Sequence, residues 1–214
     1  SYSLEANASY STSETPWRQL LSATVMQSYR SLSRYRATLH DSHTVSADAR
    51  LSYRDLFSRI FAHIGAGWYR SWSDIAYGTT LDDQGQSLLE ASYIPHHSER
   101  YTLSAYGRKD IDWQTMQLAL SATLTHAEQE LLRQGDLMSH RVLGYSLQGS
   151  LGLDLIQGYR LEYDVRWQGL WFHLSGRELR SNELNQRLQL TLDFLPARLQ
   201  AKLHAKHCHN SGAY

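Results

Sequence analysis

Apolar residues occupy every second position over most of the stretch between Trp113 and Ala205. Two of the clearest runs cover residues 116–124 and 143–155, where leucines alternate with Ser, Thr, Gln and Gly. Successive side chains of a β-strand point to opposite faces, so this period predicts strands with one apolar and one polar face. The polar positions include Arg, Glu and Asp, which belong in water. A long sheet with these two faces is typical of an antiparallel transmembrane β-barrel.

The alternation and its interruptions predict about eleven strands. They are expected at residues 2–10, 17–35, 45–53, 59–77, 87–94, 100–107, 113–128, 140–155, 159–174, 184–194 and 199–205. The second of these is less regular than the others, because its apolar residues fall on both faces. Several strands exceed ten residues, which is enough to cross a bilayer when the strands are tilted.

The connections between these strands are expected to alternate in length. Short turns are predicted near 55–58, 108–112, 156–158 and 195–197, and longer polar loops near 79–86, 130–139 and 177–183. A hairpin is expected around Pro95. Short turns at one edge and long loops at the other are typical of outer-membrane barrels. A soluble β-sandwich or up-and-down barrel is the alternative, although its strands are usually shorter.

Composition narrows the class of protein. The chain has 214 residues and a net charge of zero, so no basic field indicates nucleic acid as a partner. Its single cysteine excludes an internal disulfide framework, and no apolar run is long enough for a membrane-spanning helix. Aromatic residues expected to lie at the level of lipid headgroups are Trp68, Trp72, Trp113, Trp167, Trp171 and Tyr163.

Charged residues on the ninth predicted strand are expected to face the interior of a barrel. Arg160, Glu162, Asp164 and Arg166 occupy alternate positions there, opposite in phase to Val165. Such side chains would line a water-filled path or contact a plug. The alternation alone motivates this interpretation.

Metal-binding and catalytic signatures are weak in this sequence. His204, His207, Cys208 and His209 are ligand types for zinc or copper, but Cys208 should point away from His207 and His209 on a strand. His96 and His97, which follow Pro95, fit a solvated turn. Nucleophile-elbow, phosphate-loop and dinucleotide motifs do not occur. The sequence therefore predicts no catalytic, cofactor-binding or metal-binding residues, no cofactor, and no enzymatic activity.

Residues 52–214 contain several segments that resemble outer-membrane barrels of Bacteroidota, of the TonB-dependent receptor type. The resemblance rests on loose motifs rather than on catalytic signatures. They are Ser52-Tyr53-Arg54-Asp55, the turn at 106–113, the hairpin at 191–197 and the strand end at 205–210.

The resemblance implies a barrel of up to 22 strands around a plug domain, supplied with energy by TonB. On this basis residues 1–214 are expected to form a single barrel segment that lacks a plug domain and lacks strands at both ends, since an unpaired sheet edge cannot lie in lipid. The expected function is uptake of a small nutrient ligand across the bacterial outer membrane, with the lipid bilayer, a plug and TonB as partners. A passive porin, a structural or assembly barrel, and a soluble β-sheet binding module remain as alternatives.

Overall fold

The computed structural model describes residues 1–14, 24–28, 31–34, 41–81, 87–111, 115–133, 135–156, 158–174, 177–194 and 199–212. Eleven strands occupy almost all of this part of the chain. They are β1 (Tyr2–Glu14), β2 (Thr24–Ser28), β3 (Ser31–Arg34), β4 (Asp41–Asp55), β5 (Ile60–Leu81), β6 (Ser87–Ile111), β7 (Met116–Arg133), β8 (Asp136–Ile156), β9 (Tyr159–Leu174), β10 (Arg177–Phe194) and β11 (Leu199–Gly212). The prediction of about eleven strands and an all-β class is confirmed.

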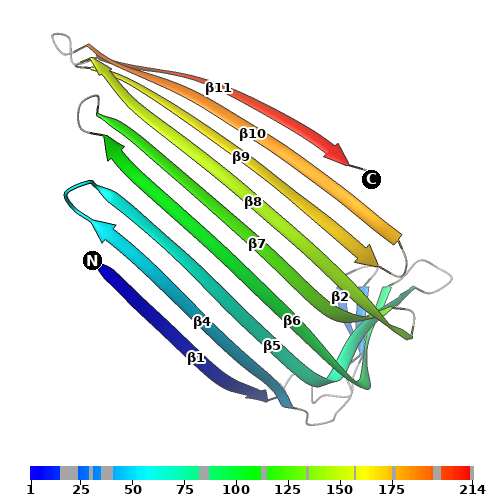
Figure 1. Ribbon diagram of the computed structural model, residues 1–214. Coiled ribbons are helices and arrows are strands. Elements are labelled where there is room, and N and C mark those ends of the chain that lie inside the picture. The colour runs from blue at the N-terminus through cyan, green and yellow to red at the C-terminus, as the bar shows by residue number, and fades with distance from the viewer. Residues whose placement is uncertain are drawn as a thin grey trace.

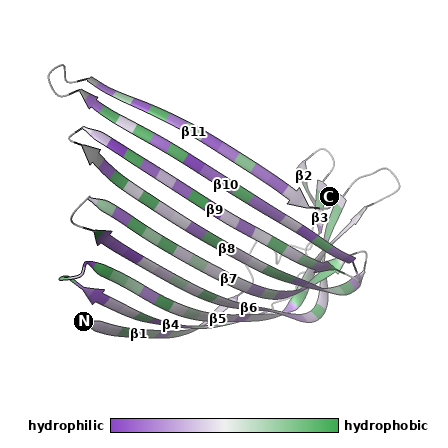
Figure 2. Cartoon of the chain, turned by 45° about the horizontal axis from the view of Figure 1, so that its top comes forward, coloured by the Kyte–Doolittle hydropathy of each residue, from purple (hydrophilic) through white to green (hydrophobic). Residues whose placement is uncertain are grey.

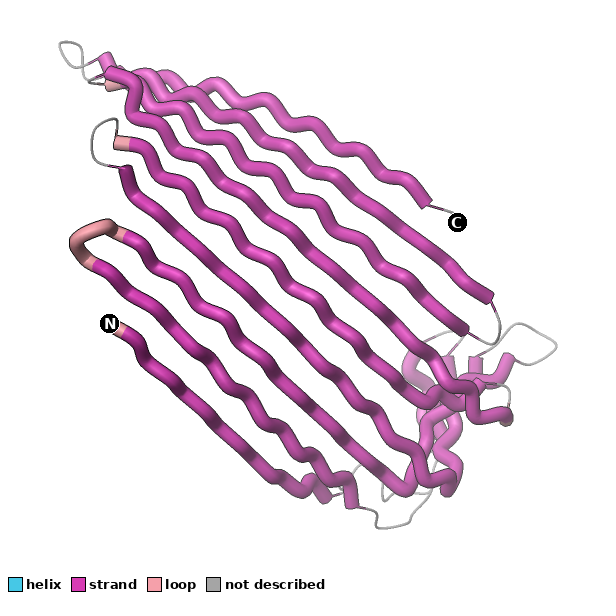
Figure 3. The backbone as a smooth tube through the Cα atoms, in the orientation of Figure 1, coloured by secondary structure: helices cyan, strands magenta, loops and turns pink. Residues whose placement is uncertain are grey.

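Nine of the strands form one continuous sheet in the order β1-β4-β5-β6-β7-β8-β9-β10-β11. Each neighbouring pair on this path is antiparallel, and the strands lie side by side in one curved layer (Figure 1). The tube view in Figure 3 shows the same layer, with the turn between β4 and β5 at the ends of these strands. No pairing between β1 and β11 occurs among the described residues, so the sheet is open.

A short hairpin lies outside this path. Strands β2 and β3 pair with each other, and β3 also pairs in parallel with the start of β6, from Ser31 opposite Ser87 to Arg34 opposite Glu90. Ser33 is buried at this junction. The predicted strand at 17–35 therefore corresponds to two short strands, and its remaining residues lie outside the described part.

Pro95 does not form a hairpin, and this prediction is wrong. It lies within β6, a single strand of 25 residues. The register of β5 against β6 shifts between Ser73 and Ile75, where Asp74 is opposite both Ile94 and Pro95. A β-bulge leaves one residue outside the hydrogen-bond ladder, so it accommodates a proline, which has no N–H to donate.

Two of the predicted long loops are also largely strand. β7 continues to Arg133 and β8 begins at Asp136, so the connection includes Gly135 in a left-handed conformation with φ of 91°. β10 begins at Arg177, inside the predicted loop at 177–183. Polar residues on both faces suggested loops here, but a strand that projects into water also carries polar residues on both faces.

The turns at the other ends of these strands agree better with the turns predicted from the sequence. A turn occupies 56–59 between β4 and β5, and Gly158 has a φ of 92° between β8 and β9. The predicted turn at 108–112 is displaced, because β6 extends to Ile111. The predicted turn at 195–197 lies outside the described residues.

Among the described residues, fully buried apolar side chains occur in one small region. Ile75, Ala76 and Ala91, at the ends of β5 and β6 beyond the bulge, are each only 3% exposed. Many large apolar side chains elsewhere are exposed, with exposed leucines ranging from 38% for Leu118 to 73% for Leu4. Among the described residues no helix has the length and hydropathy required to span a membrane.

Candidate functional site: the two faces of the sheet

The strand register divides the sheet into an apolar face and a polar face, since residues directly opposite one another share a face. The apolar face is defined by the row that contains Ile64, and alternation of hydropathy along the strands is visible in Figure 2. The row runs through Leu4, Leu51, Ile64, Ala105, Ala122, Leu147, Trp167 and Leu184. It crosses eight strands without a charged residue.

The apolar face is exposed rather than packed against another layer. Ile64 is 64% exposed, Leu120 is 59% exposed and Leu203 is 61% exposed. These residues come from strands in the middle and at the end of the sheet. An apolar surface this extensive is not expected on a monomer in water.

The apolar residues of this face form a band, which covers residues 60–68 of β5 and 116–124 of β7. This apolar band runs at an angle to the rows of paired residues. The row that contains Tyr10 and Val45 in β1 and β4 continues as Arg70, Glu99 and Glu128 in β5, β6 and β7. At the other end of the sheet, the apolar residues of β11 lie closer to the edge formed by the β4–β5 and β8–β9 turns. This displacement is what strands tilted relative to a membrane require, because a band of constant height must then cross successive rows.

An aromatic cluster marks one boundary of the band on β8, β9 and β10. The rings of Trp167 and Trp171 lie with centroids 5.0 and 5.2 Å from that of Tyr145. The guanidinium carbon of Arg180 lies 5.2 Å from the centroid of the Trp171 ring, and the Tyr145 hydroxyl donates to Asn182 Oδ1 at 2.9 Å. We refer to Tyr145, Trp167, Trp171 and Arg180 as the aromatic cluster.

Gly169 makes this cluster possible. A Cβ at this position would lie 2.6 Å from the Tyr145 ring and 2.7 Å from Asn182 Oδ1. The tyrosine ring therefore lies over the glycine, between the two tryptophans of the same strand. Sequence reasoning missed this arrangement, although the same-face spacing of Trp167, Gly169 and Trp171 is a signal that could have revealed it.

The other boundary of the band also carries aromatic residues. Tyr2 and Tyr53 are paired, with ring centroids 4.8 Å apart. Tyr159 and Tyr163 share the apolar face of β9 with Val165. Of the predicted headgroup-level residues, Trp68, Trp72, Trp167, Trp171 and Tyr163 share the apolar face, and Trp113 lies outside the described residues.

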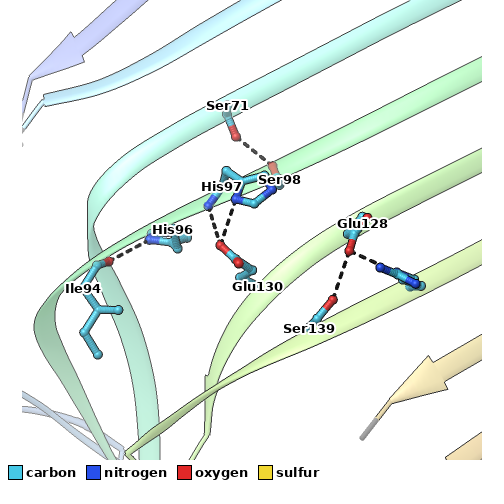
Figure 4. Close-up of polar contacts among 9 residues, drawn as sticks. Ser71, Ile94, His96, His97, Ser98, Glu128, Glu130 and Ser139 are labelled. Carbon is cyan, nitrogen blue, oxygen red and sulfur yellow. Dashed lines mark hydrogen bonds and ion pairs between the residues drawn. The ribbon is translucent and has the colours of Figure 1, made fainter. Parts of the chain in front are cut away.

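Charged residues occupy the apolar-face positions beyond the band, and Figure 4 shows part of this region. We refer to Glu99, Glu128, Glu130 and Arg141 as the charged belt. Arg141 Nε donates to Glu128 Oε1 at 3.0 Å, and the backbone N–H of His97 donates to Glu130 Oε2 at 2.9 Å. The hydrogen bond from Arg141 holds the pKa of Glu128 below its usual value. Hydrogen bonds from Trp68 and then Tyr101 lower the pKa of Glu99 in the same way. The lowered pKa values favour the ionised forms of Glu99 and Glu128, and an ionised carboxylate is favourable only where water or headgroups surround it.

The polar face carries the charged residues expected to face a barrel interior. Arg160 Nε lies 2.8 Å from Glu162 Oε1 and 3.9 Å from Asp154 Oδ1. Asp164 and Arg166 lie on this face, opposite in phase to Val165. A second polar group forms around Glu183, which accepts from Gln168 Nε2 at 2.5 Å and Asn185 Nδ2 at 2.6 Å.

The histidine-rich end of β11 does not assemble into one group. His207 and His209 occupy the apolar-face phase, whereas His204 and Cys208 occupy the polar-face phase. Cys208 Sγ lies 3.5 Å from Asn210 Oδ1. His96 bonds the carbonyl of Ile94, and the ring of His97 lies 3.0 Å from Glu130, inside a strand rather than in a turn. In the described part of the chain no three His, Cys, Asp or Glu side chains gather in a geometry suited to a metal ion.

Comparison with known proteins does not assign the chain to a family. No family model and no curated protein sequence matches the chain. The chain is similar to a solved structure described as outer-membrane expressed OmpT of Vibrio cholerae, with 11% sequence identity and a TM-score of 0.43. The match covers 81% of this chain and 50% of that protein, so the chain spans about half the length of OmpT.

One sequence-based prediction is corrected at this point. The sequence predicts no enzymatic activity, and this prediction is withdrawn, because a match at this level of similarity assigns neither an activity nor the absence of one. The predictions of no cofactor and no metal stay predictions.

Proposed function

We propose that this chain forms part of the wall of an outer-membrane β-barrel, with its apolar face toward lipid and its polar face toward the lumen. The observation that carries the proposal is the tilted apolar band. It crosses the sheet with aromatic residues at both boundaries, and its large side chains are exposed. In lipid, exposed apolar side chains of this kind are solvated by acyl chains.

The dimensions support this placement. On β5 the band runs from Ile60 to Trp68, and on β7 it runs from Met116 to Leu124. Each segment has about the 9–11 residues that a tilted strand needs to cross the hydrocarbon core. The strands then extend well beyond the band at one edge only, which favours that edge as the extracellular side.

The finer proposal is a receptor of the TonB-dependent type from a Bacteroidota outer membrane, importing a small nutrient ligand. It is supported by the motifs at 52–55, 106–113, 191–197 and 205–210. In this proposal residues 1–214 are a barrel segment of a larger protein whose plug and further strands lie outside them. The ion-paired Arg160 and the Glu183 group then line the wall that a plug or ligand would contact.

Adjacent substitutions on β9 test the orientation of the wall. Val165→Arg places a charge on the apolar face, and should block assembly into membranes because a cation in the middle of the bilayer costs about 2–4 kcal/mol. Arg166→Glu reverses a charge on the polar face and should leave assembly intact. The measurement is the fraction of chain recovered in outer-membrane fractions after expression of the reading frame that contains it.

The two variants act as controls for each other, because they change neighbouring residues of one strand. Equal recovery of both variants, or loss of Arg166→Glu alone, contradicts the orientation. A chain that remains monodisperse in buffer without detergent supports the soluble binding module instead. If the chain assembles into membranes but uptake does not depend on TonB, the result supports a passive porin instead of a TonB-dependent receptor.

A further inference from the structure

We propose that the aromatic cluster and the groove beside it form a binding site for an anionic lipid, with the acyl chain in the groove and the phosphate on Arg180. This inference rests on the proposed function, since it requires the apolar face to lie in a membrane. It adds a specific ligand class and a specific position to a surface that otherwise contacts lipid without selectivity.

The groove provides the apolar part of the site. It lies on the apolar face across β5 to β10, with Arg180 in its lining, and has a volume of about 600 Å³. Its lining combines small residues, which deepen it, with bulky ones that form its sides. The lining includes Ala105, Ala122, Leu103, Leu124, Leu147 and Trp167. A groove with this lining fits a hydrocarbon chain better than a polar ligand.

Arg180 is placed at the end of the groove where the apolar band ends. Its guanidinium carbon lies over the Trp171 ring, and Trp171 also lines the groove. A guanidinium held over an aromatic ring keeps in-plane N–H groups for a bidentate interaction with phosphate. A lysine would not provide this geometry.

The surrounding charges make Arg180 the residue available for an anion. Glu128 is paired with Arg141 at 3.0 Å, and Glu178 lies 3.7 Å from His173. No carboxylate pairs with Arg180 among the described residues, although Glu178 shares its face two positions away. A guanidinium beside an apolar groove at headgroup level complements a lipid that carries both a negative headgroup and an acyl chain.

The cluster is also built to hold its shape. The Tyr145 ring is fixed between Trp167 and Trp171 by the absence of a side chain at Gly169 and by the hydrogen bond to Asn182. A site that is ordered before the ligand binds loses less conformational entropy on binding. This order distinguishes the cluster from isolated exposed residues such as Leu203.

Lipid retention by the full chain folded in detergent micelles tests the site. Native mass spectrometry with equal amounts of phosphatidylglycerol and phosphatidylcholine should show preferential retention of phosphatidylglycerol. Arg180→Gln should lower this preference roughly tenfold, the scale of one charge-assisted hydrogen bond. Arg177→Gln is the matched control, because it removes the same charge from the same strand on the polar face, and should keep the preference.

A second variant tests the groove without changing charge. Ala122→Trp fills the groove and should reduce retention of phosphatidylglycerol, while the far-ultraviolet circular dichroism of the sheet is unchanged. Equal retention of both lipids by the wild-type chain, an equal loss in Arg177→Gln and Arg180→Gln, or normal retention in Ala122→Trp overturns the inference. A chain that folds and stays monodisperse without detergent would instead overturn the proposed function on which the site rests.

Discussion

Two regions of the sheet differ in how far their apolar side chains are exposed. In the apolar band, Ile64 of β5 is 64% exposed. In the extension beyond it, formed by residues 69–81 of β5 and 87–100 of β6, Ile75 and Ala91 are only 3% exposed. The same strands therefore expose apolar side chains in one region and bury them in the other. The extension has the small core that a structure in water needs, whereas the band has no partner within the described protein.

The two faces of β8, β9 and β10 exchange polarity where these strands leave the apolar band. Beyond the band, Arg141, His173 and Glu178 occupy the apolar-face phase, while Val142, Phe172 and Leu179 occupy the polar-face phase. No register shift accompanies the exchange, since pairing is continuous through this part of β8, β9 and β10. The apolar side chains therefore move to the other face of these strands, while the backbone pairing keeps the same register. This is expected where the outside of a barrel wall passes from lipid into water.

The largest loss of stability is expected from a substitution in the buried core of the extension. Ile75→Ala removes a buried side chain and should destabilise the extension by about 2 kcal/mol or more, because the cavity it leaves is only partly filled. Ile64→Ala, the same substitution on the same strand in the band, should change stability little in detergent. Hydrogen exchange of the backbone amides of β5 and β6 measures both. Equal effects of the two substitutions would contradict the distinction between band and extension.

An intermediate effect is expected at the aromatic cluster. Gly169→Ala places a Cβ within 2.6 Å of the Tyr145 ring, and should cost about 1–3 kcal/mol because the ring and Asn182 must move. Gly67→Ala is the control, since nothing lies within 4 Å of the position its Cβ would occupy. Tryptophan fluorescence should shift in Gly169→Ala and not in Gly67→Ala. Denaturant titration in detergent gives the difference in free energy of unfolding.

The smallest effect is expected from the charged belt. The pKa of Glu128 is lowered in the folded chain, so its pairing with Arg141 stabilises the fold above the usual glutamate pKa. That contribution is lost as the pH falls through the lowered folded pKa. Because the pair is exposed, it should contribute less than about 1 kcal/mol.

Acid titration of the free energy of unfolding checks this prediction. Glu128→Gln should be less stable than the wild-type chain at neutral pH, and the difference should vanish in acid. Glu5→Gln is the control, because the Glu5 carboxylate on the polar face of β1 makes no hydrogen bond or ion pair within the described part of the chain, and it should not change the acid dependence. A difference between Glu128→Gln and wild type that persists in acid would show that the charge of Glu128 is not responsible.

The face occupied by each side chain was largely readable from the sequence. Val165 and Arg166 lie on opposite faces as the alternation predicts, and Cys208 points away from His207. A strand has a period of two regardless of its partners, so this information is local. For the same reason the all-β class and most of the strand centres were predicted correctly.

Strand ends were less predictable, because polarity has different meanings in different surroundings. Residues 177–183 are polar and were expected to form a loop, yet they begin β10. Pro95 was expected to break a strand, yet it lies in a bulge opposite Asp74. Whether a polar segment turns or continues depends on whether a neighbouring strand is available to pair with it. That neighbour is distant in sequence.

The sequence by itself determined the period of the strands, and with it a sheet that has one apolar and one polar face. Only the tertiary structure decided how the strands are registered, and therefore that the apolar band is tilted across their rows. It also decided that Tyr145, Trp171 and Arg180 of three different strands meet beside one groove. The physical reason is that alternation is a property of a single strand, whereas register is set by hydrogen bonds and side-chain pairs between strands.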